Sequence, residues 1–206
     1  MKDHRVERLA DLLLRYSLGI KKNELLLIQA SPPATPLIKE LYKQALLLGA
    51  HPHTFITIED LSEIFYKFAR PHQLRYLSPI REFIVKKVDA FIWIMGSLNT
   101  RTLYGVDPAR MAVTARSQEK LQRIFLKRER KGRLRWSGCL YPTYASAQDA
   151  EMSLDDYEEF VYRACYCNRR DPIGAWRRIE REQARLVRKL NRLKKLRIVT
   201  KGTDLE

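Results

Sequence analysis

Short apolar runs and helix-like periodic segments alternate along the first half of the chain. The runs are too short for good helices, and they predict buried strands at 25–30, 53–58 and 90–96. The 90–96 run is the most apolar of the three and is expected to be a central strand. Helical patterns occur between the runs, over 6–19, 31–48, 59–70 and 80–87.

Capping residues define the helices of the second half. Asp107-Pro108 and Asp171-Pro172 are good helix starts, because Asp accepts backbone N–H bonds at the cap and Pro fits the first turn. The first of these helices can run to Arg130, and 133–141 then has a strand-like pattern. The alternation of strands and helices predicts an α/β fold with a mostly parallel sheet covered by helices on both faces.

The end of the chain adds three expectations. A helix should begin at Ser153, which stands at the capping-box spacing from Asp156. In the helix that follows Asp171, apolar residues recur at three- and four-residue steps over 173–193, which predicts one buried stripe. The last apolar run, 196–200, predicts a short strand without a partner strand in the chain.

Composition excludes several classes of protein. With 45% hydrophobic and 31% charged residues, the chain is too apolar for a disordered tail and too polar for a membrane protein. Its apolar stretches are far shorter than the ~20 residues that span a bilayer, and its first residues are not signal-like. We therefore predict a cytoplasmic protein with no membrane partner. Three cysteines form neither a disulfide framework nor a CxxC pair, so reduced thiols are expected.

The net charge of +15 is concentrated in two segments. Residues 110–135 hold ten basic and two acidic residues, and 169–201 hold thirteen basic and three acidic residues. Arginine stems can cover apolar surface while their heads stay in water, so solvated helix faces are the favoured interpretation. The alternative is a non-catalytic basic module that binds an anionic partner such as RNA, although these segments hold few aromatic residues for base stacking.

The usual catalytic motifs are absent from the sequence, which contains no GxGxxG, GxxxxGK[ST], HExxH or GxSxG. His51 and His53 would share one face of a strand, where a two-histidine metal site is conceivable. No third ligand is apparent, however, and such histidines are more often surface groups. Cys139 is interpreted as a small buried hydrophobe rather than a nucleophile. No catalytic, cofactor-binding or metal-binding residue is assigned.

One region of the sequence is recognisable. Its strings are Trp136-Ser137-Gly138-Cys139-Leu140-Tyr141-Pro142-Thr143-Tyr144-Ala145-Ser146-Ala147-Gln148, Met152-Ser153-Leu154 and Asp156-Tyr157-Glu158-Glu159-Phe160-Val161-Tyr162-Arg163-Ala164. They resemble the W…YPT.A.AQ.A.MS..EYE.FV pattern of the thermophilic metallo-aminopeptidase family, which includes aminopeptidases T and S. Shorter stretches resemble the family in the same order, at 16–20, 48–52, 99–108 and 196–205. The resemblance covers nearly the whole chain.

The resemblance implies a cytoplasmic, homodimeric exopeptidase with two divalent metal ions, zinc or cobalt, that removes N-terminal residues from peptides. The family's metal ligands lie downstream of the segment that resembles Gly202-Thr203-Asp204, so none of them maps onto this chain. Residues 1–195 are therefore expected to form the N-terminal α/β domain of such an enzyme, and 196–206 to begin the connection to a catalytic domain. This chain alone is expected to bind no metal and to be inactive. The catalytic half would be a missing domain or a second polypeptide.

The densest part of the shared pattern is the Tyr141-Pro142-Thr143-Tyr144 loop, together with Gln148. These residues are candidates for contact with the catalytic domain. Their Pro and Ser/Thr content also predicts a tight turn with a capped helix, which is the interpretation we favour.

Overall fold

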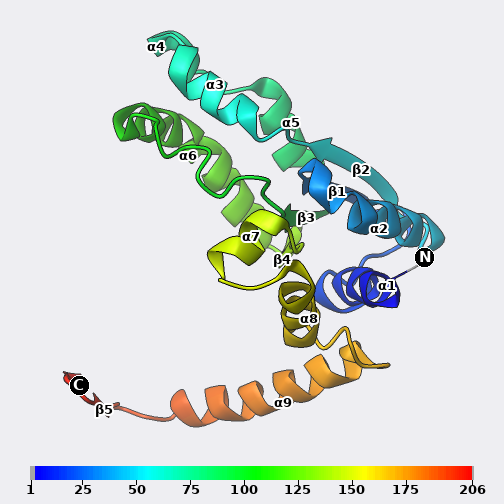
Figure 1. The fold of residues 1–206 in the computed structure, drawn as a ribbon. Coiled ribbons are helices and arrows are strands. Elements are labelled where there is room, and N and C mark those ends of the chain that lie inside the picture. Colours follow the sequence, from blue (N-terminus) through cyan, green and yellow to red (C-terminus); the bar gives the residue numbers. More distant parts are fainter. Residues whose placement is uncertain (1–2, 206) are drawn as a thin grey trace.

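A computed structural model describes residues 3–205 of the chain (Figure 1). Its helices are α1 His4–Asp11, η1 Leu12–Ser17, η2 Pro32–Ala34, α2 Thr35–Leu47, α3 Asp60–Phe68, α4 Pro71–Leu74, α5 Pro79–Lys87, α6 Pro108–Arg130, α7 Tyr144–Asp149, α8 Leu154–Ala164 and α9 Pro172–Leu190. Its strands are β1 Leu25–Ala30, β2 His51–Ile56, β3 Ala90–Met95, β4 Arg135–Leu140, β5 Ile198–Thr200 and β6 Thr203–Leu205.

Four parallel strands form the main sheet in the order β2-β1-β3-β4. The predicted central position of the 90–96 run is confirmed, because β3 pairs with β1 on one side and β4 on the other. After β2 the chain crosses over β1 to reach β3, so the direction of strand addition reverses between β1 and β3. The carboxyl ends of all four strands lie along one edge of the sheet.

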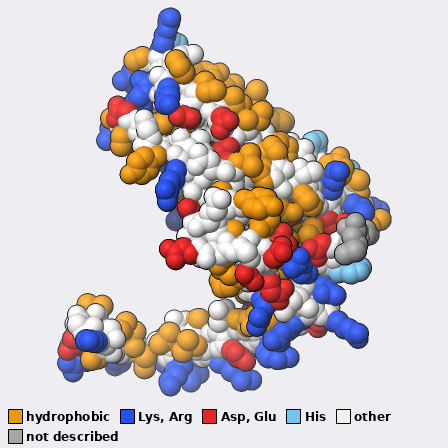
Figure 2. Space-filling view, in the orientation of Figure 1, with side chains coloured by type: hydrophobic (Ala, Val, Ile, Leu, Met, Phe, Trp, Pro, Cys, Tyr) orange, Lys and Arg blue, Asp and Glu red, His pale blue; other side chains and the backbone are white. Residues whose placement is uncertain are grey.

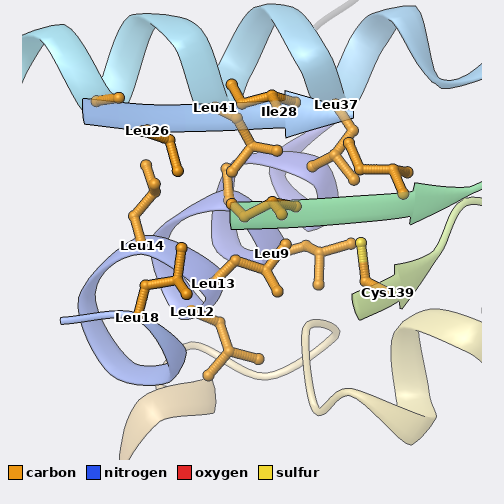
Figure 3. Close-up of a cluster of buried hydrophobic side chains, with 14 of the residues drawn as sticks. Leu9, Leu12, Leu13, Leu14, Leu18, Leu26, Ile28, Leu37, Leu41 and Cys139 are labelled. Atoms are coloured by element: carbon orange, nitrogen blue, oxygen red, sulfur yellow. The ribbon is translucent and has the colours of Figure 1, made fainter. Parts of the chain in front are cut away.

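The main core lies on one face of this sheet, under α1, η1 and α2. Side chains from alternate strand positions, such as Leu26 and Ile28, pack against Leu9 of α1 and Leu41 of α2, as Figure 3 shows. Leu26, Ile28 and Leu41 are fully enclosed. Alternation along a strand places every second residue on the same face, which is why a continuous apolar run can fill two layers at once.

The opposite face is covered by α5 and α6, but only in part. Leu27, Val88 and Leu134 form a smaller core there, with Phe91 and Phe125 packed against it. On the β3 and β4 part of this face, however, four large side chains stay exposed: Trp93, Met95, Trp136 and Leu140. The predicted α/β fold with helices on both faces is confirmed, and the two faces differ in how completely they are covered.

Most predicted helix ends agree with the structure. The helix α6 spans Pro108–Arg130, with the Asp107 carboxylate accepting from the N–H of Ala109 at 2.9 Å. Ser153 caps α8 by accepting from the N–H of Asp156 at 3.1 Å. Strand β2 differs, because it begins at His51, two residues earlier than predicted. It is an edge strand, where the missing N–H of a proline is tolerated.

The predicted burial of the stripe along α9 is wrong for the outer part of this helix. Near its start, Ile173 and Trp176 pack against the main core. Further out, Leu186, Leu190 and Leu193 are 55%, 40% and 48% exposed. The helix leaves the body of the molecule (Figure 1), and among residues 3–205 no element covers its outer apolar face. Periodicity identifies an amphipathic face, but it does not show whether this chain supplies a neighbour for it.

The expectation of an unpaired last strand is also wrong. β5 pairs in antiparallel fashion with β6, and the turn between them contains Gly202 at a φ of +79°. The Arg197 guanidinium closes this hairpin with two hydrogen bonds to the Asp204 carboxylate, at 2.7 and 2.5 Å. A three-residue partner strand is too short to show alternation in the sequence.

Candidate functional site at the carboxyl edge of the sheet

In open parallel sheets, ligands commonly bind where the direction of strand addition reverses, beyond the carboxyl ends of the strands. Here that point lies between β1 and β3. The Ser31 hydroxyl donates a hydrogen bond to the Gly96 carbonyl and ties the two strand ends together. The available hollow of about 250 Å³ lies farther toward β4. It is lined by Pro33, Ser97, Leu98, Tyr141, Pro142, Thr143, Tyr144, Ala145, Leu154 and Glu158.

The 141–144 loop forms one wall of this hollow. The N–H of Tyr141 donates to the Met95 carbonyl at 2.8 Å, and the chain then turns into α7. Thr143 is buried, and its hydroxyl accepts from the N–H of Ser146 at 3.3 Å, which caps α7. The tight turn with a capped helix is therefore confirmed. Tyr144 and Gln148 are exposed, so they are free to contact another polypeptide.

An ion cluster lies below this loop. The Arg5 guanidinium contacts the Asp3 carboxylate at 2.8 Å and the Glu158 carboxylate at 3.0 Å, and it lies 4.6 Å from the centre of the Tyr162 ring. A hydrogen bond from Arg5 lowers the pKa of Asp3. Burial, and then the nearby Glu158 charge, raise the pKa of Tyr141. The Arg5 guanidinium thus pairs with the Glu158 carboxylate that lines the hollow.

The two histidines lie at the opposite, amino-terminal edge of the sheet. His51 and His53 are both exposed at the start of β2, on the face that strand alternation predicts. Nowhere in residues 3–205 do three His, Cys, Asp or Glu side chains converge in a geometry that could hold a metal ion.

The cysteines are buried or half-buried beside the main core. Cys139 points into that core (Figure 3), and burial raises its thiol pKa to about 12. Burial also raises the pKa of Cys165, and it raises that of Cys167 to about 12. Thiols with such values are protonated at neutral pH and are poor nucleophiles. These facts support the interpretation of Cys139 as a small buried hydrophobe.

The exposed part of α9 separates two kinds of side chain. Hydrophobic residues line the side that faces the body of the molecule, and basic residues line the far side (Figure 2). The basic face comprises Arg177, Arg178, Arg181, Arg185, Arg188, Lys189 and Arg192. None of these seven residues forms an ion pair within the described chain. Within residues 3–205, no helix is long and apolar enough to cross a membrane.

Comparisons with known proteins agree with this fold. The profile of the thermophilic metalloprotease (M29) family matches residues 2–206. Aminopeptidase 2 of Geobacillus stearothermophilus is 26% identical over 198 residues, which cover 90% of this chain and 48% of that protein. The wild-type AmpT structure from Thermus thermophilus superposes with a TM-score of 0.69 at 17% identity, over 86% of this chain and 46% of AmpT. The chain therefore spans about half the length of these relatives.

Proposed function

Because this chain belongs to the thermophilic metalloprotease (M29) family, we propose that it is the N-terminal, non-catalytic half of a metal-dependent aminopeptidase that removes N-terminal residues from peptides. The observation that carries the proposal is the extent of the match. The family profile covers residues 2–206, whereas the alignment with Aminopeptidase 2, which covers 90% of this chain, spans only 48% of that protein. The other half of such an enzyme would contain the metal ligands.

In this proposal two divalent metal ions, zinc or cobalt, are bound by the catalytic half, and residues 3–205 supply no ligand to them. The chain's own contribution is a scaffold and part of the wall of the substrate cavity. The proposal includes a homodimer in the cytoplasm, as the family resemblance implies.

Two uncovered apolar surfaces support a partner of this kind. One is the outer face of α9, with Leu186, Leu190 and Leu193. The other is the exposed part of the sheet around Trp93 and Trp136. Large exposed apolar surfaces commonly mark contacts with another protein unit. We propose that both pack against the catalytic half, with the 141–144 loop at the margin of the interface.

The test compares the product of the complete gene, from its natural start to its natural stop codon, with the 206-residue chain. We expect the complete product, or this chain mixed with a second polypeptide that carries the ligands, to release leucine from leucine p-nitroanilide when zinc or cobalt is present. The 206-residue chain alone should neither bind zinc stoichiometrically nor hydrolyse this substrate. Stoichiometric zinc and hydrolysis by this chain alone would overturn the proposal.

A double variant, Leu190→Glu with Leu193→Glu, examines the interface. Both side chains are exposed, so the free chain should keep its melting temperature. The assembled enzyme should lose activity because two charges would be buried at the contact. Arg185→Glu on the opposite, basic face is the matched control and should leave assembly intact.

The basic face of α9 favours a second candidate function, the binding of an anionic partner such as RNA. Seven unpaired cations on one helix face form a surface that could contact phosphates. A gel-shift titration at several salt concentrations tests this candidate. Affinity should fall steeply as salt rises, because each neutralised phosphate releases counterions. Micromolar or weaker binding at physiological salt would reject this function.

A further inference from the structure

A long apolar groove lies on the partly covered face of the sheet, away from the hollow at the 141–144 loop. It consists of two adjoining hollows that share Phe55 and Arg81. The outer hollow, of about 490 Å³, is lined by Phe55, Ile56, Thr57, Ile58, Leu61, Ser62, Phe65, Tyr66, Gln73, Tyr76, Ser78, Arg81, Thr114 and Gln118. The inner hollow, of about 200 Å³, is lined by Leu27, Gln29, Phe55, Arg81, Ile84, Val85, Val88, Phe91, Leu121 and Phe125.

The lining is mainly apolar and aromatic. Leu61 and Tyr76 are more than half exposed, and hydrophobic side chains gather on the surface over α3 and α5 (Figure 2). The inner hollow, of about 200 Å³, has room for a single apolar side chain, and the outer one, of about 490 Å³, is more than twice as large. Sites that bind small ligands usually combine such a lining with a few polar groups.

Arg81 supplies the charge at the junction of the two hollows. It forms no hydrogen bond or ion pair within the described residues. The neighbouring carboxylate of Glu82 is already engaged by Lys86 at 2.6 Å and by Lys120 at 2.9 Å. The Arg81 guanidinium is thus available for a carboxylate from outside the chain, which it could hold with two parallel hydrogen bonds.

Two further polar atoms in the groove wall have no partner. They are the Thr57 hydroxyl oxygen and the Gln118 side-chain oxygen, and both are enclosed. The Gln118 amide nitrogen donates only to the Ser117 hydroxyl, at 3.3 Å. Burying a polar atom without a hydrogen bond is unfavourable, so such atoms are rare in folded proteins, and a bound ligand can supply the missing partner. Rotation of the Gln118 side chain would present its oxygen to the backbone N–H of a bound chain.

We propose that this groove binds the carboxyl-terminal end of a peptide whose last side chains are apolar. Arg81 pairs with the terminal carboxylate, the inner hollow takes one side chain, and Gln118 and Thr57 bond to the peptide backbone. This inference rests on the proposed function, since it supplies the peptide as substrate. An aminopeptidase shortens a peptide from its amino end, so a site that holds the opposite end is compatible with repeated cleavage.

The test measures the affinity of the full chain for the tetrapeptide Gly-Ala-Leu-Phe by titration calorimetry. The same peptide with a C-terminal amide should bind at least about tenfold more weakly, because a charge-assisted pair is lost. Arg81→Gln should weaken binding of the acid by a similar factor and leave binding of the amide unchanged. Arg185→Gln removes one equally unpaired charge from α9 and should change neither affinity.

Nuclear magnetic resonance locates the site. Amide signals of residues 55–61 and 114–118 should shift on titration of the acid peptide, whereas signals from the 141–144 loop should not. Equal affinity for acid and amide would overturn the role of Arg81. Equal affinity for octanoate would show a general site for apolar carboxylates and overturn the peptide assignment. Self-association of the chain through the groove would overturn it too.

These results are separable from those for the proposed function. If the assembled protein has no peptidase activity but the acid peptide binds with the expected dependence on Arg81, the groove remains a peptide site and only the enzymatic assignment fails. If metal-dependent activity is present and the peptide does not bind the groove, the inference fails alone.

Discussion

The helices α6 and α9 have the same kind of sequence, but they occupy different environments. Each follows an Asp-Pro start, and the cap carboxylate accepts a backbone N–H in both, at 2.9 Å for Asp107 and 2.8 Å for Asp171. Each also carries a dense set of basic residues. Yet α6 packs along α5 and the sheet, whereas the outer part of α9 contacts no other element of the described chain.

The difference comes from what the basic side chains can reach. Arg110 donates to two carbonyls at the end of α3, and Arg128 donates to the Val85 and Val88 carbonyls at the end of α5, at 2.8 and 2.6 Å. Carbonyls at a helix end lack intrahelical partners and carry partial negative charge, so arginines satisfy them well. Within residues 3–205, the outer arginines of α9 donate to no carbonyl at the end of another helix, and Arg188 donates only to the Ala184 carbonyl of α9 itself, at 3.2 Å. A basic helix becomes structural only where acceptors of this kind are within reach.

Truncation of one leucine in each helix should give the largest contrast. Leu121→Ala in α6 should lower the free energy of unfolding by about 2–3 kcal/mol, toward the low end for buried leucines because its side chain borders an existing hollow. Leu190→Ala in α9 should change it by less than about 0.5 kcal/mol, since that side chain is already exposed. Urea denaturation of both variants measures this. A large loss for Leu190→Ala would show that α9 is packed in solution.

Removal of one arginine from each helix should have a smaller effect. Arg128→Ala leaves the Val85 and Val88 carbonyls without their donor and should cost about 1–2 kcal/mol. Arg185→Ala should be neutral within about 0.5 kcal/mol, because no partner is lost. Thermal unfolding of the pair checks the prediction. Equal effects would contradict the distinction between structural and solvated arginines.

The two N-caps provide a third contrast. Asp107→Ala should cost about 1 kcal/mol of global stability, since α6 is part of the folded body. Asp171→Ala should increase amide hydrogen exchange within α9 and change global unfolding less, because much of α9 contributes no packing. Hydrogen-exchange mass spectrometry, combined with denaturation, separates the two effects. Similar global losses in both variants would contradict this expectation.

Local signals in the sequence were sufficient for most of the fold. The bounds of β1 and α6 agree with the apolar run and the Asp-Pro start that predicted them, because strand pattern and helix capping depend on neighbouring residues. The turn and cap at Thr143 were predictable for the same reason. The short helix α4 lacks a full amphipathic period, and sequence periodicity does not resolve it.

Features that depend on distant segments were not predictable. The exposed stripe of α9 has the same periodicity as a buried one, so its environment depends on a neighbour that periodicity does not identify. The groove at Arg81 combines residues from 55–66, 73–81 and 114–118. The groove is distinguished by the missing hydrogen-bond partners of Arg81, Thr57 and Gln118. Which side chains lack partners depends on the folded chain, so the sequence does not show it.

Salt should give the smallest and most specific contrast between the helices. The seven basic residues on one face of α9 repel one another without compensating ion pairs, whereas Lys120 and Arg123 of α6 are paired with Glu82 and Glu119. Raising the salt concentration from about 10 mM to about 150 mM shortens the screening length from about 30 Å to about 8 Å. Like charges on neighbouring helix turns cost a few tenths of a kcal/mol per pair.

Hydrogen exchange in α9 should therefore slow by about twofold at the higher salt concentration. Exchange in α6 should stay constant or rise slightly as its ion pairs weaken. An equal response of both helices would show that the charge on α9 is neutralised in solution, and the seven arginines and lysines would then need a bound anion as their partner.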